Sequence, residues 1–412
     1  MNAGEIAAAV GRGEISALES VEAALARLAA AEDLNAVITV CGEQALARAR
    51  AGVAGRLAGV PLLVKDLIDT AGVRTTYASS IYAERVPDRT APVVEALERE
   101  GAIVVAKTNA DEFAWGVCGQ NEHWGDMGNP AHPGRITGGS SGGNASALAA
   151  GLAPLALGTD TGGSVRMPAA GCEIVGLKPL LGAISTEGVF PLSPSFDTVG
   201  PMAQTVADCA LAHSILTGTA VPAATFEGLR VGVLTSRPAV GPETGEEPRD
   251  ERALAHVARL ESLGARVTEV ELPVPEADTW PVFYAEAAAA HRATFPSRRD
   301  EYGAVVRAKL ESAQDIDPAV VDAARRALAA WREQAAVAPD VDLVVSPTLG
   351  LAELPPAGVD ELEIRIHFSA YTRVFSYLGW PAIAIGGLQL AGRDPATVIG
   401  AALALEQADR LR

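Results

Sequence analysis

Residues 137–168 read TGGSSGGNASALAAGLAPLALGTDTGGSVRMP. Two Gly-Gly-Ser elements end at Ser140 and Ser164, and between them lie a run of small residues typical of a helix and a short apolar run typical of a strand. Adjacent glycines allow the backbone to turn tightly and bring successive N–H groups close to one point. Such N–H groups can bind the oxyanion that forms when a serine attacks a carbonyl group. The segment therefore favours acyl-transfer chemistry.

Three other glycine-rich features fit this segment less well. A flexible linker explains one Gly/Ser run, but two such elements flanked by helix and strand patterns disfavour it. A phosphate-binding loop carries a lysine after its glycines, and no lysine follows here. Asp160-Thr161-Gly162 resembles half of an aspartic-protease site, but no second Asp-Thr-Gly occurs in the chain.

Residues 138–142 also match the G-x-S-x-G motif of α/β-hydrolases, with Ser140, Asp342 and His367 in the usual order of that triad. The serine of that motif follows a strand directly, whereas the residues before Ser140 have the composition of a loop. His367 lies in an amphipathic helical pattern, where an ordinary histidine is expected. A serine enzyme without a suitable histidine needs another base, and lysine is the candidate.

The chain contains four lysines among its 33 basic residues: Lys65, Lys107, Lys178 and Lys309. A lysine has a reference pKa of about 10.4, so burial must depress it before the amine can accept a proton near neutral pH. Lys65 and Lys107 each follow an apolar run that predicts a buried strand. Position alone does not choose between them.

The rest of the chain predicts alternating strands and helices. Ser16 and Glu19 form a capping-box pair at the start of a helix within the first 50 residues. Short apolar runs predict strands at residues 60–64, 103–106, 155–157, 231–234, 267–272, 343–345 and 382–385. Helical patterns occur at residues 91–100, 252–263 and 318–336. This alternation predicts an α/β fold with a largely covered sheet. Residues 236–250, rich in Pro, Gly and acid, are expected to form an exposed loop within one domain.

The bulk composition excludes several classes of protein. The 412 residues carry a formal charge of −18, which disfavours binding to nucleic acid or to an anionic membrane. We expect a soluble cytoplasmic protein, because the N-terminus does not resemble a signal peptide and no run of roughly 18 apolar residues occurs. The cysteines are far apart and are expected to be reduced, buried thiols: Cys41, Cys118, Cys172 and Cys209.

Residues 138–170, GGSSGGNASALAAGLAPLALGTDTGGSVRMPAA, closely resemble the signature region of the amidase signature family. The match continues in LAGVPLLVKDLIDTAG, GAIVVAKTNADEFAWG, VGLKP and SFDTVGPMAQTVAD, and DLVVSPTL and SYLGWPAIAIGGLQLAGR resemble the family's closing strands. The resemblance covers essentially the whole chain and is strongest over residues 57–217. It implies a single amidase domain over residues 1–412, with N-terminal helices at about 1–50, a signature core at about 57–217 and a C-terminal half at about 229–412. The implied fold is α/β, with a large mixed, twisted sheet covered by helices on both faces.

The resemblance also implies a Ser–cis-Ser–Lys triad. Ser164 falls at the position of the nucleophile, Ser140 at that of a bridging serine preceded by a cis peptide bond, and Lys65 at that of the base. The family pattern thus selects Lys65 over Lys107. No metal, nucleotide or other cofactor is implied.

Further site residues follow from the same resemblance. The backbone N–H groups of the nucleophile turn would form an oxyanion hole: Thr161, Gly162, Gly163 and Ser164. Asp160 and Arg166 would support this turn as an ion pair, and Ser141 would support it by a hydrogen bond. The segment where relatives line the substrate pocket contains Phe113, Ala114 and Trp115.

The implied reaction is hydrolysis of a small-molecule carboxylic amide to an acid and ammonia or an amine, through a serine acyl-enzyme. The alternative within the family is the glutaminase component of a tRNA-dependent amidotransferase, whose motif DEFAWG resembles. Met167 stands where those glutaminases usually carry glutamine, so we expect a stand-alone amidase. A non-catalytic protein that keeps the fold is disfavoured because every triad position is filled.

The C-terminal half contains no decisive clamp for a substrate. Trp280, Tyr284 and Phe375 are candidates for an aromatic acyl site, although packing between helices explains them equally well. Arg307 could bind a substrate carboxylate but is expected to be an ordinary surface arginine. The acidic surface is compatible with a homodimer.

Overall fold

The computed structural model describes residues 1–236 and 250–410. Its strands are β1 (Val37–Val40), β2 (Pro61–Lys65), β3 (Ile103–Thr108), β4 (Leu155–Asp160), β5 (Val175–Lys178), β6 (Thr198–Ala203), β7 (Arg230–Leu234), β8 (Arg266–Val270), β9 (Leu343–Pro347), β10 (Ala382–Ile385) and β11 (Leu388–Ala391). These strands of the described residues form one 11-stranded sheet in the order β1-β3-β2-β4-β6-β5-β10-β11-β9-β7-β8. The pairs β2–β3, β2–β4, β7–β8 and β7–β9 are parallel and the remaining pairs are antiparallel, so the sheet is mixed.

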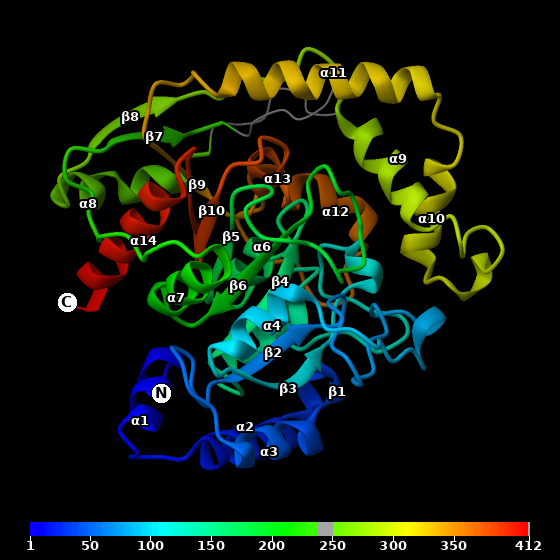
Figure 1. Cartoon of the computed structure of the whole chain (residues 1–412). Helices are drawn as coiled ribbons and strands as arrows, with labels where there is room; N and C mark the ends of the chain where they lie inside the picture. The colour runs from blue at the N-terminus through cyan, green and yellow to red at the C-terminus, as the bar shows by residue number, and fades with distance from the viewer. Residues whose placement is uncertain (237–249, 411–412) are drawn as a thin grey trace.

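Helices cover both faces of this sheet (Figure 1). They are α1 (Ala3–Gly11), α2 (Ala17–Ala30), α3 (Gly42–Ala51), α4 (Pro92–Arg99), α5 (Gly142–Ala149), α6 (Arg166–Gly171), α7 (Val206–Thr217), α8 (Val257–Ser262), α9 (Trp280–Ala290), α10 (Ala304–Ala313), α11 (Pro318–Ala335), α12 (Glu361–Phe368), α13 (Ala370–Tyr377) and α14 (Pro395–Arg410). The core on one face includes residues of α1, α4, α7, α8 and α14. The opposite face packs against α2, α3, α5 and α6, and farther along the sheet against α9, α10, α11 and α13.

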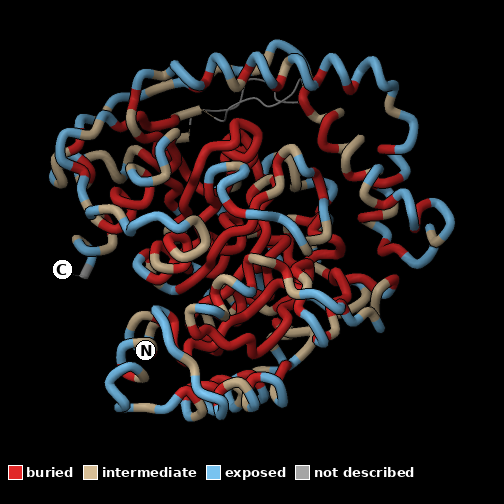
Figure 2. The backbone as a smooth tube through the Cα atoms, viewed as in Figure 1, coloured by how far each residue is buried: buried red, intermediate tan, exposed pale blue. Residues whose placement is uncertain are grey.

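The alternation of side chains along each strand explains the two layers. Leu62 and Val64 of β2 belong to the core on one face, whereas Leu63 between them belongs to the core on the other. Every residue of β2, β3 and β4 is buried. Figure 2 shows the buried segments gathered in the sheet and the exposed segments on the outer sides of the helices. The sheet is therefore covered on both faces, as the continuous apolar runs predict.

The predicted α/β class is confirmed, and each strand and helix predicted from an apolar or helical run has a counterpart. The capping box of Ser16 and Glu19 is present at the start of α2. The N-terminal segment expected to be helical also contains β1, which pairs with β3. The helix predicted at residues 252–263 begins as a 3₁₀ turn over Arg252–His256 before α8. Most of the loop predicted at residues 236–250 lies outside the described residues, and the single-domain organisation stays a prediction.

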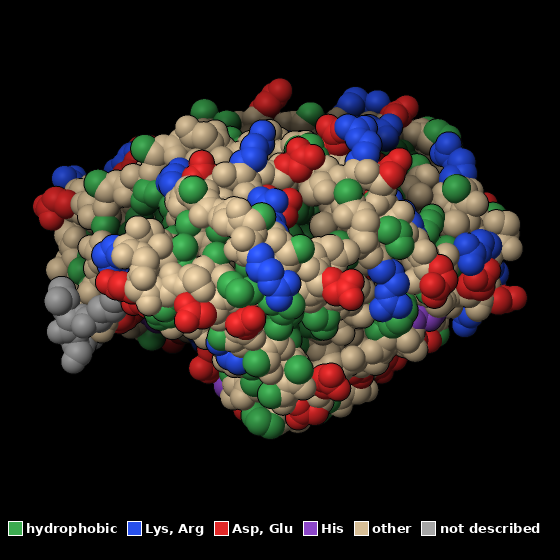
Figure 3. Space-filling view, turned by 60° about the horizontal axis from the view of Figure 1, so that its bottom comes forward, with side chains coloured by type: hydrophobic (Ala, Val, Ile, Leu, Met, Phe, Trp, Pro, Cys, Tyr) green, Lys and Arg blue, Asp and Glu red, His purple; other side chains and the backbone are tan. Residues whose placement is uncertain are grey.

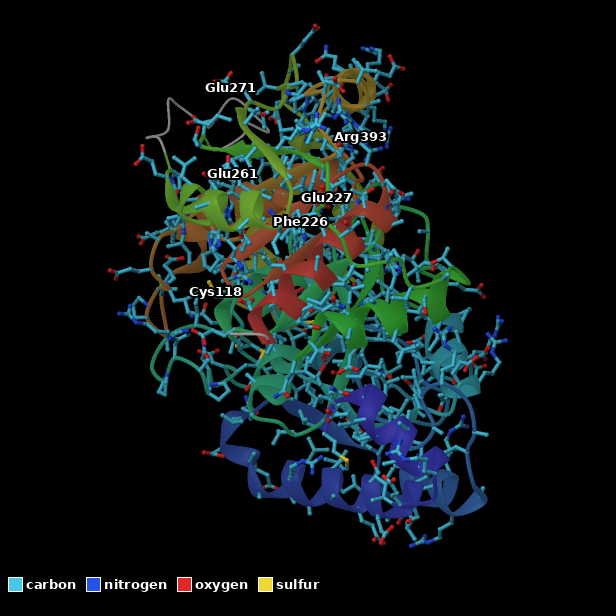
Figure 4. The ribbon with its side chains drawn as sticks, turned by 90° about the vertical axis from the view of Figure 1, so that its left-hand side faces the viewer. Cys118, Phe226, Glu227, Glu261, Glu271 and Arg393 are labelled. Atoms are coloured by element: carbon cyan, nitrogen blue, oxygen red, sulfur yellow. The ribbon has the colours of Figure 1, made fainter. Side chains whose placement is uncertain are left out.

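The molecular surface carries charges of both signs. On the face shown in Figure 3, acidic and basic side chains are interspersed and apolar side chains form small groups. Figure 4 shows Phe226 and Glu227 beside α14, where Thr225 N donates to Gly400 O. All four cysteines, including the labelled Cys118, are buried and free, as the sequence predicts. Among the described residues, no helix has the length and apolar character needed to span a membrane.

The register of the central strands brings two chain segments to one edge of the sheet. β2 runs parallel to β4, with Val64 opposite Leu157, so the carboxyl end of each strand lies at the same edge. β2 ends at Lys65, and β4 ends at Asp160 immediately before the second Gly-Gly-Ser element. The residues nominated from separate parts of the sequence therefore meet where these strands end.

Candidate active site

Lys65 lies at the end of β2 in a fully buried position. Its Nζ is 2.7 Å from Ser140 Oγ and 2.8 Å from Thr159 Oγ1. Burial lowers the pKa of Lys65 to about 7, and the negative charges of Asp111, Asp160 and Asp197 keep the pKa from falling farther. The amine is thus substantially neutral near pH 7 and can accept the hydroxyl proton of Ser140.

The first Gly-Gly-Ser element holds Ser140 beside this amine. The peptide bond between Gly139 and Ser140 is cis, as the family resemblance implies. Gly139 N donates to Val117 O at 2.7 Å, and Asp111 N donates to Ser140 O at 3.3 Å. Ser140 itself is fully buried and follows a loop rather than a strand. Backbone contacts on both sides of the serine therefore fix its position next to Lys65.

The second Gly-Gly-Ser element forms the turn from β4 into α6. Ser141 N donates to Ser164 O at 3.1 Å, which joins the two serine-bearing turns. The hydroxyl of Ser141 donates to Thr159 O at 3.4 Å. Ser164 is almost buried but lines a cavity, so its side chain lies where the buried site meets space for a ligand.

Asp160 organises the nucleophile turn through its carboxylate. Oδ1 accepts from Gly163 N at 2.8 Å, and Oδ2 accepts from Val165 N at 3.2 Å. Arg166 donates to both oxygens, from Nε at 3.0 Å and from Nη2 at 2.9 Å. Burial raises the pKa of Asp160, but the charge and hydrogen bonds of Arg166, helped by Lys178 and Val165, hold the pKa below its ordinary value. The expected ion pair is therefore present, fully buried and charged.

The donors expected for an oxyanion hole divide into two groups. Gly163 N already donates to Asp160 Oδ1. Within the described residues, the N–H groups of Thr161, Gly162 and Ser164 have no hydrogen-bond acceptor. All three of these residues also line the cavity. Unpaired donors beside a serine hydroxyl are the groups that could bind an oxyanion.

The cavity at Ser164 is built mainly from aromatic and small residues, and it encloses about 560 Å³ that is partly open to solvent. Ala114 and Trp115 line it, whereas Phe113 lies behind them, fully buried among Phe190, His291 and Tyr302. The lining residues from α9, α10, α12 and α13 are Trp280, Phe283, Tyr284, Lys309, Arg365, Ser369, Arg373 and Tyr377. The remaining lining residues are Gly116, Val117, Met167 and Leu192. Phe375 and Arg307 are absent from this described lining.

The competing bases and triads lie elsewhere. Lys107 Nζ donates to Thr75 Oγ1 at 2.8 Å and to Ile68 O, and it lies 4.0 Å from Asp66. Asp342 forms an ion pair with Arg230. His367 is exposed on α12. The structure thus brings Lys65, and not Lys107, to Ser140, and Asp342 is engaged away from the serines.

Several residues of the site were not predicted from the sequence. Thr159 contacts the Lys65 amine, Asp197 accepts from Thr161 Oγ1 at 2.6 Å, and Ser376 donates to Asp160 Oδ1 at 3.1 Å. Thr159 precedes Asp160 on β4, so knowledge that β2 and β4 are neighbours would have found it. Asp197 and Ser376 are far from the signature in sequence and gave no comparable signal. Within the described residues, no three His, Cys, Asp or Glu side chains are arranged to hold a metal ion.

The mixed sheet and the buried lysine beside a serine are those of an α/β enzyme with a serine-containing site. The family model described as Amidase matches residues 19–390. The chain therefore belongs to the amidase family, whose enzymes act on the carbon–nitrogen bonds of amides.

Two groups of relatives are similar to the chain over different extents. The GatA-type component of the glutamyl-tRNA(Gln) amidotransferase of Chromohalobacter salexigens is 42% identical over 294 residues, which is 65% of this chain and 60% of the relative. The corresponding component from Symbiobacterium thermophilum is 43% identical over 290 residues, covering 64% of this chain and 59% of the relative. A solved amidase structure is 31% identical with a TM-score of 0.88, and the match covers 99% of this chain and 100% of that one. The match thus spans about 60% of the length of these curated relatives and the full length of the solved amidase.

Proposed function

We propose that the protein is a stand-alone amidase in which Ser164 attacks the carbonyl carbon of a small carboxylic amide. The observation that carries this proposal is the 2.7 Å contact between Lys65 Nζ and Ser140 Oγ at a buried amine whose pKa is lowered to about 7. A serine hydroxyl is a poor nucleophile until a base takes its proton, and a neutral amine in this position can do so through Ser140.

The reaction proceeds in two halves. Lys65 accepts the proton of Ser140 as Ser140 accepts that of Ser164, and Ser164 Oγ bonds to the amide carbon. The N–H groups of Thr161, Gly162 and Ser164 bind the resulting oxyanion, and the proton returns through Ser140 to the leaving nitrogen. Water then attacks the acyl-enzyme along the same proton path, which releases the acid and restores Ser164.

The stand-alone function is supported by the full-length match to a solved amidase and by Met167 in the cavity wall. Purified protein should release ammonia from simple carboxylic amides without any partner. A fluorophosphonate probe should label the wild type at Ser164 and should not label Ser164→Ala. Absence of both ammonia release and labelling in a folded protein would refute the proposed function.

A second candidate is the glutaminase component of a tRNA-dependent amidotransferase, because the curated relatives at 40–43% identity are components of such amidotransferases. This function requires partner proteins that receive the ammonia. The two candidates separate in one comparison, since a glutaminase of this kind would release ammonia from glutamine in the presence of its partners and would leave simple amides intact.

A further inference from the structure

We propose that the cavity at Ser164 selects amides whose far end carries a carboxylate, and that Arg365 binds this carboxylate with Arg373 beside it. The inference rests on the proposed amidase function and adds the class of substrate. The expected substrate is a half-amide of a dicarboxylic acid, in which an apolar spacer separates the reacting amide from the charged end.

The lining of the cavity carries positive charge alone among the described residues. Lys309, Arg365 and Arg373 line it, and none of the described lining residues is Asp or Glu. The charge of Lys309 is balanced, because its amine forms an ion pair with Glu361 and donates to Trp115 O at 2.6 Å. The two arginines therefore decide the electrostatic preference of the cavity. This preference is local, since the whole chain has a formal charge of −18.

Arg373 is held rigidly in the wall. Its Nη2 donates to Ile366 O at 2.9 Å and to Ser369 Oγ at 2.5 Å. Its guanidinium lies over Trp280, with Cζ 4.3 Å from the ring centroid. Ser369 Oγ in turn donates to Arg365 O at 2.6 Å, so the wall segments that carry the two arginines are bonded to each other. A fixed guanidinium next to an aromatic face favours recognition of a planar anion.

Arg365 has hydrogen-bonding capacity that the described residues do not satisfy. Its Nε is buried and has no hydrogen-bond partner in the described part of the chain. A buried donor without an acceptor is costly, and a carboxylate can accept from Nε and a terminal nitrogen together. Arg365 also borders a neighbouring cavity next to Trp280 and Tyr284, so the group lies at the outer end of the site.

The walls between the arginines and Ser164 favour an apolar spacer. Trp115, Trp280, Phe283, Tyr284 and Tyr377 supply aromatic surface around the cavity. Aromatic walls exclude water and strengthen the attraction between a guanidinium and a carboxylate. Thr372, next to Arg373, donates to Gly162 O at 2.8 Å, which ties the cationic wall directly to the nucleophile turn. A ligand of fixed length could therefore place its amide at Ser164 and its carboxylate at Arg365.

Binding to a Ser164→Ala variant, which cannot form the acyl-enzyme, tests this inference by calorimetry. The probes are the half-amides of straight-chain dicarboxylic acids with two to four methylene groups, each compared with the neutral amide of equal length. At least one half-amide should bind roughly tenfold or more tightly than its neutral partner, as expected for a charge-assisted hydrogen bond in a buried site. Arg365→Gln should reduce this ratio to near one, and Arg365→Lys should retain part of it. Arg307→Gln, which removes an arginine of α10 outside the described lining, should leave the ratio unchanged.

The outcomes separate the inference from the proposed function. Equal affinities for the two classes, a preference that survives Arg365→Gln, or no binding of any half-amide would overturn the inference. Hydrolysis of neutral amides by the wild type alongside such a result would leave the amidase function standing. Conversely, an Arg365-dependent preference together with no ammonia release from any amide would support the anion site and refute the proposed reaction.

Discussion

Ser141 and Ser164 are joined by a backbone hydrogen bond of 3.1 Å, so the turn that holds Ser140 and the turn that holds Ser164 form one connected unit. Lys65 reaches this unit from the neighbouring strand and contacts it through Ser140 and Thr159. The amine and both serine-bearing turns therefore share one frame of backbone and side-chain contacts.

Replacement of Lys65 by methionine keeps most of the side-chain volume but removes the base. We expect kcat for amide hydrolysis to fall by on the order of 10²–10⁴, the usual contribution of general acid–base catalysis. Thr159→Val removes only the second contact of the amine and should cost about tenfold or less. Circular dichroism should show both variants folded, and equal losses in the two variants would contradict the assignment of Lys65 as base.

The pH dependence of kcat/KM should show an acid limb with a midpoint near pH 7. Lys65 must be neutral to accept a proton, and burial lowers its pKa to about 7. The neutral fraction therefore rises with pH through this value, and activity rises with it. An activity that stays constant between pH 5 and pH 9 would exclude a lysine base that titrates in this range.

Asp111 should control the position of this limb. It is fully buried, and its negative charge raises the pKa of Lys65. Asp111→Asn removes the charge and keeps an oxygen that can accept from Cys118 N and Gly119 N, which donate to this side chain. The pKa of Lys65 should then fall, so the acid limb should move to lower pH. Asp126→Asn, a change at an exposed acid nearby, provides the control and should leave the limb in place.

The ion pair of Asp160 and Arg166 should stabilise the fold as well as the site. Both side chains are fully buried, so Arg166→Leu leaves a buried carboxylate without its partner. We expect the free energy of unfolding in urea to fall by about 3–5 kcal/mol. Arg12→Leu breaks the exposed pair with Glu14 and should have no measurable effect on the same transition.

Two adjacent glycines should respond differently to alanine. Gly163 has a φ of 132°, and a Cβ built there would lie 2.1 Å from Thr372 Oγ1. Gly163→Ala should therefore destabilise the protein by about 2 kcal/mol or more and distort the nucleophile turn. A Cβ at Gly162 meets no atom within 4 Å, so Gly162→Ala should leave the melting temperature unchanged. Equal melting temperatures for the two variants would contradict this account.

The local features of the site could be predicted from the sequence, because they lie on short segments with distinctive residues. The turns around Ser140 and Ser164, the strand that ends at Lys65 and the Asp160–Arg166 pair all fall within such segments. β6 was not predicted, since Gly200 and Pro201 argue against a central strand, yet the strand lies between β4 and β5 with Pro201 opposite Leu157.

The walls of the cavity could not be predicted in the same way. Trp280, Arg365 and Arg373 come from helices that pack together only in the folded chain, and each has an ordinary explanation as a packing or surface residue. Their shared position depends on tertiary packing, which no single-residue pattern encodes. The sequence therefore predicted the position of the chemistry better than the class of substrate.

The hydrogen bond from Thr372 Oγ1 to Gly162 O has a consequence for altering this protein. The reactive turns occupy residues 137–168, whereas much of the cavity wall comes from residues 280–377, so the two are largely independent targets for engineering. Substitutions at Trp280 or Arg365 change which molecules enter and leave the reactive turns untouched. Thr372 is the coupling point between the two parts, and a library that varies it would alter substrate range and turnover together.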